Sequence, residues 1–345
     1  MRSSSPAPPS ARSCSASDRV TPTPFRPYPF ASGGHRQTLL GYLLRYHLRW
    51  TGPCEDLIAD AGDGVRLLVR ASWQPGPREA RPLLVLLHGL SGCDRASHAV
   101  ATAEHAWARG WHVWRMNMRG AGDGEALCAR LYNAGLDTDL LAVLRAAAAH
   151  TPRVAAAGFS LGANVTLLAA GRQRDALPRE LAAVAGVSPP LDLAACADAL
   201  DRRQNRLYVL NFLSDLRRSY QRRQRRLPQL YAPDRERGLR SIRQYDEVIT
   251  APYGGFDDAR DYYARSSAGP YVSRIDRPAL LLAAADDPMI PVESVTRWPL
   301  PAGGHVQREI LPTGGHVGFV APTRAPARFW AAERVMDFFE EAIGR

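Results

Sequence analysis

Short apolar runs alternate with longer segments of helical periodicity along most of the chain. The apolar runs predict buried strands at residues 82–87, 111–118, 154–158, 182–187, 279–284 and 306–311. Apolar residues at helical spacing predict helices at residues 39–50, 99–109, 137–150, 161–170 and 329–343. Apolar and polar residues alternate at 65–70 after a glycine-rich turn at 62–64, which predicts a strand of a hairpin.

The alternation of strands and helices predicts an α/β fold, with a mostly parallel sheet that helices cover on both faces. Right-handed crossovers would place every loop that leads from a strand into a helix along one edge of that sheet. We therefore expect the chemistry of the protein at this edge. The alternation stops at about residues 191–273, where leucine and aromatic residues at helical spacing predict a helical cap inserted over the edge.

The first residues of the chain differ from the rest in composition. Residues 1–24 are rich in Ser, Pro and Ala and contain no apolar run, which predicts a disordered leader and no signal peptide. Residues 25–345 would then form the α/β domain with its cap. No segment approaches the roughly 20 continuous apolar residues that cross a bilayer, so we expect a cytoplasmic protein. The five cysteines form no CxxC pair and predict reduced thiols, without a disulfide framework or a zinc site.

The formal net charge of +10 comes from arginine alone, because the chain contains no lysine. This absence excludes a Ser-Lys dyad, a Schiff-base lysine and a P-loop lysine. Thirteen arginines lie between residues 201 and 250. They could form a solvated helical face, a surface that attracts anionic lipid or acidic substrate, or a nucleic-acid surface. No zinc finger or aromatic-interleaved strand supports the last, so we expect no nucleic acid and at most weak membrane-surface contact through the cap.

Residues 154–162 carry the most informative motif, a strand followed by Gly-x-Ser-x-Gly and a helix. A serine hydroxyl is a poor nucleophile unless it is held exposed beside a base. A sharp turn from strand to helix exposes it, and Gly158 and Gly162 avoid collisions with the flanking elements. We therefore predict that Ser160 is a nucleophile and that the N–H of Leu161 stabilises an oxyanion. An ordinary glycine-rich turn is the alternative.

A second oxyanion donor is expected in the loop after the strand at 82–87. Gly89 would let the backbone approach Ser160 closely, and the N–H of Leu90 is the candidate donor. His88 is expected to fix this loop and not to act as a base.

The acid is expected after the strand at 279–284, where Asp286 and Asp287 follow. We prefer Asp287, because the proline after it would hold its carboxylate still, but Asp286 stays open and both could merely cap a turn. His305 and His316 lie in identical local sequences, Gly-Gly-His-Val. Only His316 follows the strand at 306–311 and emerges at the edge that carries Ser160, so we predict His316 as the base.

The predicted order of serine, aspartate and histidine is that of the α/β-hydrolases. In this arrangement His316 would take the proton of Ser160, and Asp287 would orient the imidazole and stabilise its charged form.

These residues, and much of the sequence outside them, resemble the YheT-like family of α/β-hydrolases. The motifs that carry the resemblance are His35-x-Gln37-Thr38, His88-Gly89-Leu90, residues 116–120 (MNMRG), 239–243 (LRSIR), 250–252 (TAP), 255–256 (GF), 261–263 (DYY) and 314–319 (GGHVGF). The resemblance implies an α/β-hydrolase fold with a cap and a carboxylic-ester hydrolase for short- to medium-chain esters or acylglycerols. It also implies no metal and no organic cofactor.

The chain departs from the family pattern at two positions. Ala163 stands where the family usually has a second glycine after the serine turn, and a histidine is usual near Asn133. Neither position belongs to the predicted triad, so both bear on substrate shape. Two other functions stay open: a thioesterase or amidase with the same triad, and a non-catalytic protein that binds a lipid or a partner. A metallohydrolase is excluded because no HExxH or clustered ligand spacing occurs.

Overall fold

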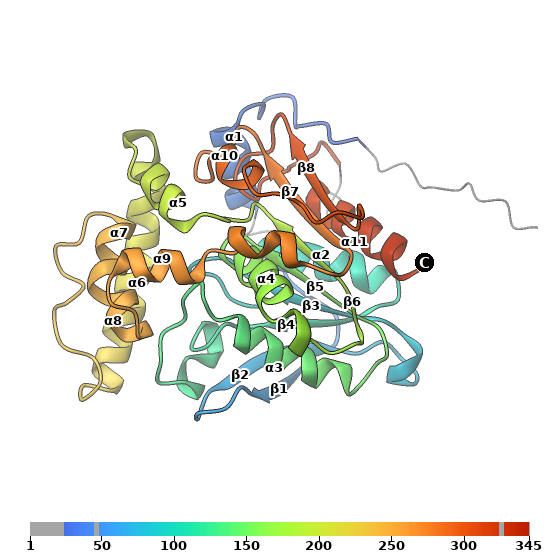
Figure 1. Ribbon diagram of the computed structural model, residues 1–345, viewed down its shortest axis with the longest axis horizontal. Coiled ribbons are helices and arrows are strands. Elements are labelled where there is room, and N and C mark those ends of the chain that lie inside the picture. The colour runs from blue at the N-terminus through green and yellow to red at the C-terminus, as the bar shows by residue number, and fades with distance from the viewer. Residues whose placement is uncertain (1–23, 45–47, 324–327, 345) are drawn as a thin grey trace, which may run out of the picture.

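A single eight-stranded sheet organises the chain, in the order β1-β2-β4-β3-β5-β6-β7-β8 (Figure 1). The computed structural model describes residues 24–44, 48–323 and 328–344, so the predicted leader lies outside the described residues except for Pro24. The strands are β1 (Glu55–Asp60), β2 (Arg66–Ser72), β3 (Leu83–Leu87), β4 (His112–Met116), β5 (Val154–Phe159), β6 (Leu181–Val187), β7 (Ala279–Ala284) and β8 (Val306–Leu311). The pairings of β2 with β1 and with β4 are antiparallel, and the other five pairings of the sheet are parallel. This confirms the prediction of a mostly parallel α/β sheet.

Helices cover both faces of the sheet, and the central strand β3 shows why its sequence is wholly apolar. Leu83, Val85 and Leu87 belong to one core cluster with residues of α3 (Asp137–Ala148) and α4 (Leu161–Arg172). Leu84 and Leu86 point to the other face and pack with residues of α2 (Ser97–Ala108) and α11 (Trp330–Ile343). Because side chains alternate along a strand, a strand between two helical layers must be apolar at every position.

The remaining elements lie outside these layers. Between β6 and β7 the cap consists of α5 (Leu193–Leu200), η5 (Arg203–Asn205), α6 (Arg206–Arg226), α7 (Ile242–Tyr245), η6 (Asp246–Thr250), α8 (Ala251–Gly254), α9 (Ala259–Ser266) and η7 (Gly269–Arg274). The other short elements are α1 (Gly34–Leu44), η2 (Arg78–Ala80), η3 (Gly122–Leu127), η4 (Arg174–Ala176) and α10 (Val292–Thr296). The helices from α6 to α9 form a group at the left of Figure 1, with α6 at its centre. A small apolar core of their own, which includes Leu213, Tyr220 and Ile242, holds them together.

The N-terminal elements differ most from the sequence predictions. The prediction of a helix at residues 39–50 is wrong at both ends, because α1 begins at Gly34 and residues 48–50 are not helical. Residues 45–47 lie outside the described residues. Leu48 is buried beside α2, and Trp50 lies edge-on to Trp107, so the apolar side chains of this stretch are covered without a helix.

The partner strand of the predicted hairpin is β1, which the apolar pattern did not reveal. Its sequence EDLIAD carries three acidic residues, and of its six residues only Ala59 is buried. An edge strand pairs on one side and is solvated on much of its surface, so it needs no apolar run.

No helix in the described ranges is long and apolar enough to cross a membrane. The cytoplasmic location stays a prediction.

Candidate active site

Ser160 occupies a strained turn between β5 and α4. Its backbone lies at φ 52° and ψ −121°, a region that residues with a side chain rarely adopt. The first turn of α4 begins at once, because the N–H groups of Ala163 and Asn164 donate to the Ser160 carbonyl (2.8 and 3.1 Å). This geometry lifts the Ser160 side chain out of the sheet edge and into a pocket that cap residues also line.

The two glycines of the turn are required by close contacts between backbone segments. A Cβ atom on Gly158 would lie 2.1 Å from the carbonyl oxygen of Gly162. A Cβ atom on Gly162 would lie 2.4 Å from the carbonyl oxygen of His88, in the loop after β3. No side chain fits at either position without moving the backbone.

Three loops bring Ser160, His316 and Asp287 together. The Nε2 atom of His316 lies 2.8 Å from the Ser160 Oγ, and its Nδ1 atom lies 2.9 Å from the Oδ2 of Asp287. An ionised carboxylate can only accept hydrogen bonds, so Nδ1 carries a proton and Nε2 is left to accept one from Ser160. The hydroxyl of Ser160 therefore points its proton at a base.

Asp287 is held by its own backbone turn. Its Oδ1 accepts hydrogen bonds from the N–H groups of Met289 (2.8 Å) and Ile290 (3.0 Å), and only 1% of its side chain is exposed. The carboxylate is thus fixed with its second oxygen toward His316.

Asp286 does not contact the imidazole of His316. Its Oδ2 accepts a hydrogen bond from the Thr313 hydroxyl (2.6 Å), and its Oδ1 accepts one from the Gly315 N–H (2.9 Å). The two adjacent carboxylates therefore have different roles: Asp287 binds the imidazole of His316, and Asp286 fixes the loop that carries His316.

The helix α1 supports the same loop from the N-terminal end of the chain. The Thr38 hydroxyl accepts a hydrogen bond from the His316 N–H (2.8 Å) and donates one to the Gly34 carbonyl (2.7 Å). The amide oxygen of Gln37 accepts a hydrogen bond from the Val320 N–H (2.7 Å). Both residues belong to the motif His35-x-Gln37-Thr38, which the family resemblance includes, but no local pattern in the sequence reveals their role.

The loop after β3 supplies the candidate oxyanion site. The N–H groups of Leu90 and Leu161 make no hydrogen bond to the described part of the chain, and both residues line the pocket beside Ser160. A Cβ atom on Gly89 would lie 3.2 Å from the Ser160 Cβ, so glycine permits the close approach of this loop.

The other histidines considered from the sequence have structural contacts. His88 places Nδ1 2.8 Å from the Gly89 carbonyl and accepts a hydrogen bond at Nε2 from the Met118 N–H (3.1 Å). Complete burial lowers the pKa of His88 to about 4, which keeps its ring neutral. The Nε2 of His305 lies 2.8 Å from the Ile275 carbonyl, at the opposite edge of the sheet from Ser160.

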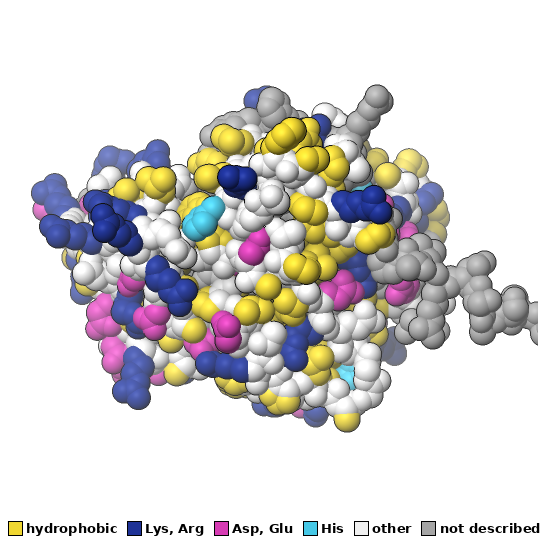
Figure 2. Space-filling view, turned by 90° about the horizontal axis from the view of Figure 1, so that it is seen from above, with side chains coloured by type: hydrophobic (Ala, Val, Ile, Leu, Met, Phe, Trp, Pro, Cys, Tyr) yellow, Lys and Arg dark blue, Asp and Glu magenta, His cyan; other side chains and the backbone are white. Residues whose placement is uncertain are grey.

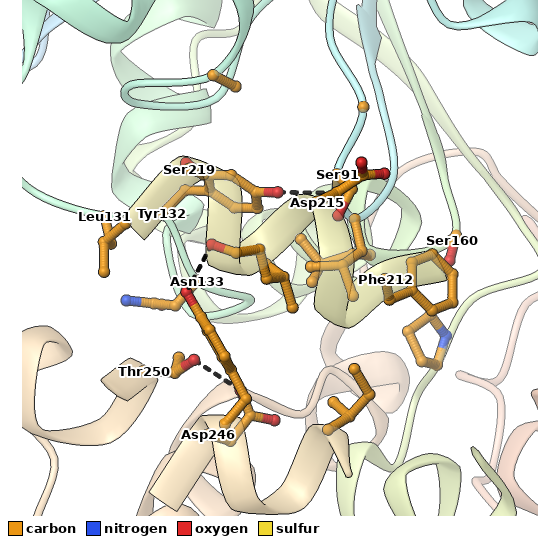
Figure 3. A pocket seen from close by; sticks show the side chains of 18 of the residues that line it. Ser91, Leu131, Tyr132, Asn133, Ser160, Phe212, Asp215, Ser219, Asp246 and Thr250 are labelled. Carbon is orange, nitrogen blue, oxygen red and sulfur yellow. Dashed lines mark hydrogen bonds between the residues drawn. The ribbon is translucent and has the colours of Figure 1, made fainter. Parts of the chain in front are cut away.

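The pocket in front of Ser160 has a volume of about 390 Å³. Figure 3 shows Ser160 at one side of it and Asp246 with Thr250 at the other. The apolar lining includes Leu90, Leu161, Leu193, Phe212, Met289 and Ile290, and the polar lining includes Asn133, Asp215, Ser219, Asp246 and Thr250. Many of these side chains come from the cap, which therefore forms much of the wall.

Asp246 is a buried carboxyl group in this wall. Its oxygens accept hydrogen bonds from Thr250 Oγ1 (2.7 Å) and the Tyr263 hydroxyl (2.8 Å). Burial raises its pKa to about 6, because the loss of solvent outweighs the two hydrogen bonds and the charge of Arg243, which lower it. Asn133 also lines the pocket, whereas Ala163 lies buried within α4 and does not.

In the described ranges, no group of three or more histidine, cysteine, aspartate or glutamate side chains could hold a metal ion. The four cysteines in these ranges are free thiols.

Comparison with known proteins gives consistent relatives. The family described as α/β hydrolase fold matches residues 82–321. "Putative esterase YheT" of Escherichia coli (strain K12) is 31% identical over 91% of this chain and 92% of its own length. "Phospholipase ABHD3" of Mus musculus is 27% identical over 76% of this chain and 64% of its own. "Monoacylglycerol lipase" of Saccharomyces cerevisiae is 27% identical over 66% of this chain and 55% of its own.

Solved structures agree on the fold. The Pyrococcus furiosus esterase Pf2001 is 17% identical, with a TM-score of 0.57 over 86% of this chain and 95% of its own. Est1E from Butyrivibrio proteoclasticus is 18% identical, with a TM-score of 0.53 over 84% of this chain and 100% of its own.

Proposed function

Since this chain belongs to the α/β-hydrolase fold family, among the relatives of YheT, we propose that it hydrolyses carboxylic esters through an acyl-enzyme on Ser160. Ester hydrolysis is the activity class of its esterase and lipase relatives, and it is the class of this chain. The proposal of Ser160, His316 and Asp287 as the catalytic triad rests on one observation. Two consecutive hydrogen bonds, of 2.8 and 2.9 Å, join the three side chains in the order that proton transfer requires.

In the first half of the proposed reaction, the Ser160 Oγ attacks the ester carbonyl carbon while His316 Nε2 takes its proton. The negative charge of Asp287 stabilises the imidazolium that forms. The carbonyl oxygen becomes an oxyanion, which the N–H groups of Leu90 and Leu161 would bind. The intermediate collapses when His316 returns the proton to the departing alcohol.

In the second half, a water molecule takes the place of the alcohol. His316 Nε2 removes a proton from this water as its oxygen attacks the acyl carbon of the acyl-enzyme. The second tetrahedral intermediate releases the carboxylic acid, and the proton returns to Ser160.

We further propose short- to medium-chain esters or acylglycerols as substrates. The pocket of about 390 Å³ lies within the size range of small-molecule sites. Ser160 and many apolar residues line the same pocket, so an acyl chain bound to Ser160 would contact some of them. Relatives named as a monoacylglycerol lipase and a phospholipase support an ester of this kind.

A fluorophosphonate probe tests the proposal directly. We expect it to label the purified protein once, and we expect Ser160→Ala to abolish the labelling. Ser219→Ala is the matched control, because Ser219 also lines the pocket but makes no hydrogen bond to a histidine in the described chain. Equal labelling of the parent and Ser160→Ala would contradict the proposed nucleophile.

A substrate panel then separates the reaction classes. We expect p-nitrophenyl esters of increasing chain length to be turned over faster than thioesters and amides of the same acyl groups. Rapid thioester cleavage beside undetectable ester turnover would assign the same triad to a thioesterase. Absence of both labelling and turnover would favour a non-catalytic binding protein.

A further inference from the structure

In the helix α1 the small and polar residues are buried and large apolar residues are exposed, which is the reverse of an ordinary surface helix. Its buried residues are Gly34, Gln37, Thr38 and Gly41, which are small or polar. Its exposed residues include Leu39, Tyr42 and Leu43. The buried face is polar because it supports the His316 loop, so the apolar residues on the other face are not explained by packing within the chain.

The start of the cap helix α6 extends this apolar surface. The hydroxyl of Tyr208 lies 3.0 Å from Nδ1 of His35, and the Tyr42 hydroxyl donates to the amide oxygen of Asn211 (3.3 Å), so α1 and α6 lie side by side. Five of the nine large apolar side chains that are exposed in the described ranges lie on these two helices. We call them the α1–α6 patch: Leu39, Tyr42, Leu43, Leu207 and Leu210, with exposed fractions from 39% to 77%.

Cations border the patch. Arg36, Arg203 and Arg206 are exposed, and their guanidinium groups form no ion pair or hydrogen bond with another described residue. Arg36 precedes Leu39 by three positions on α1, and Arg206 precedes Leu210 by four on α6, so each shares a face of its helix with that leucine. Arg203 lies in the short helix η5, directly before α6. Figure 2 looks down on the side of the molecule where α1 lies and shows apolar side chains gathered there, with arginine side chains around them and over the cap.

We propose that the α1–α6 patch docks on an anionic phospholipid surface. Leucine and tyrosine side chains would enter the boundary between headgroups and acyl chains, and the bordering arginines would bind the lipid phosphates. A second copy of the chain is a poorer occupant, because two patches bordered by unpaired arginines repel each other in a protein of net charge +10.

The position of the patch relates it to the pocket. Leu207 and Leu210 lie on α6, whose Phe212 and Leu216 line the pocket in front of Ser160. A lipid surface on the patch would therefore lie beside the pocket wall. The docking itself does not depend on Ser160 and can be measured without turnover.

Flotation of the full chain with lipid vesicles tests the docking. We expect binding to vesicles of phosphatidylcholine and phosphatidylglycerol in a ratio of 7:3, weaker binding to phosphatidylcholine alone, and release by added salt. The double variant Leu43→Ser/Leu207→Ser should lower the partition coefficient at least tenfold, and each change of Arg203 or Arg206 to Gln about fivefold.

The controls are exposed apolar residues elsewhere on the surface. Ile58 on β1 and Leu230 after α6 are 48% and 51% exposed, and Ile58→Ser/Leu230→Ser should bind vesicles as the parent does. Equal losses in the patch and control variants would overturn the proposal. So would a dimer in light scattering that Leu43→Ser/Leu207→Ser dissociates, with no vesicle binding, because a second copy would then cover the patch.

Discussion

The substitution Asp287→Asn tests the proposed triad through a single atom. The Oδ1 of Asp287 accepts two backbone N–H groups, those of Met289 and Ile290. In the variant, only the amide oxygen can accept these bonds, so it must occupy the Oδ1 position. The amide NH₂ group then takes the Oδ2 position, 2.9 Å from Nδ1 of His316.

This exchange reverses the proton arrangement of the imidazole. An NH₂ group can only donate, so Nδ1 of His316 must accept and the ring proton moves to Nε2. Nε2 then donates to Ser160 instead of accepting its proton, although every carbon, nitrogen and oxygen atom keeps its position. The same inversion in a serine-protease triad lowers kcat about 10⁴-fold, which corresponds to about 5.5 kcal/mol of transition-state stabilisation.

The neighbouring residue provides the control. In Asp286→Asn the amide oxygen still accepts from Gly315, and the Thr313 hydroxyl can turn to accept from the new NH₂ group. We expect this variant to keep more than a tenth of the parent kcat with p-nitrophenyl butyrate. Both variants should melt within a few degrees of the parent. An Asp287→Asn enzyme that retains a tenth of the parent activity, or an Asp286→Asn enzyme that loses more than Asp287→Asn does, would refute the assignment of the acid.

Two further predictions concern stability. Gly162→Ala should prevent stable folding, because its Cβ would lie 2.4 Å from the His88 carbonyl oxygen. Gly89→Ala should fold with reduced kcat, because its Cβ would lie 3.2 Å from the Ser160 Cβ. Thermal melts and ester assays of both variants check this. Because burial lowers the pKa of His88 from 6.5 to about 4, the unfolded chain binds more protons between these pH values, and His88 alone should lower the free energy of unfolding by about 2 kcal/mol from pH 7.5 to pH 5. The buried His98, whose pKa burial lowers to about 3, adds to this fall. Urea titrations at both pH values measure it, the fall should shrink in His88→Gln, and an unchanged pH dependence in that variant would contradict the cause.

The mostly parallel sheet and the candidate triad could be predicted because they depend on local signals and topology. Each buried strand is marked by an apolar run, and parallel strands place their carboxyl ends at one edge. This rule separated His316 from His305, although the two lie in identical text. The same rule predicts that the two aspartates after β7 lie at the edge of the sheet that carries Ser160.

The role of α1 could not be predicted in the same way. Thr38 and His316 are 278 positions apart, and no local pattern shows that they touch. Sequence periodicity also predicts that the apolar face of a helix is buried, whereas in α1 the buried face is the polar one. A similar limit applies to Asp286, because its contacts with Thr313 and Gly315 depend on how two loops meet.

The loop that carries His316 shows why its supports matter more for activity than for the fold. Gly314, Gly315, Val317 and Phe319 all have positive φ angles, and for residues with a side chain such angles cost on the order of 1–3 kcal/mol each. Local propensity therefore opposes this conformation, which persists because backbone N–H groups of the loop donate hydrogen bonds to the side chains of Asp286, Thr38 and Ser188. Each such bond contributes only about 1 kcal/mol, so the loss of one allows the loop to relax while the sheet stays intact. Because β7, β8 and α11 do not depend on those bonds, the structure separates the position of the base from the stability of the domain.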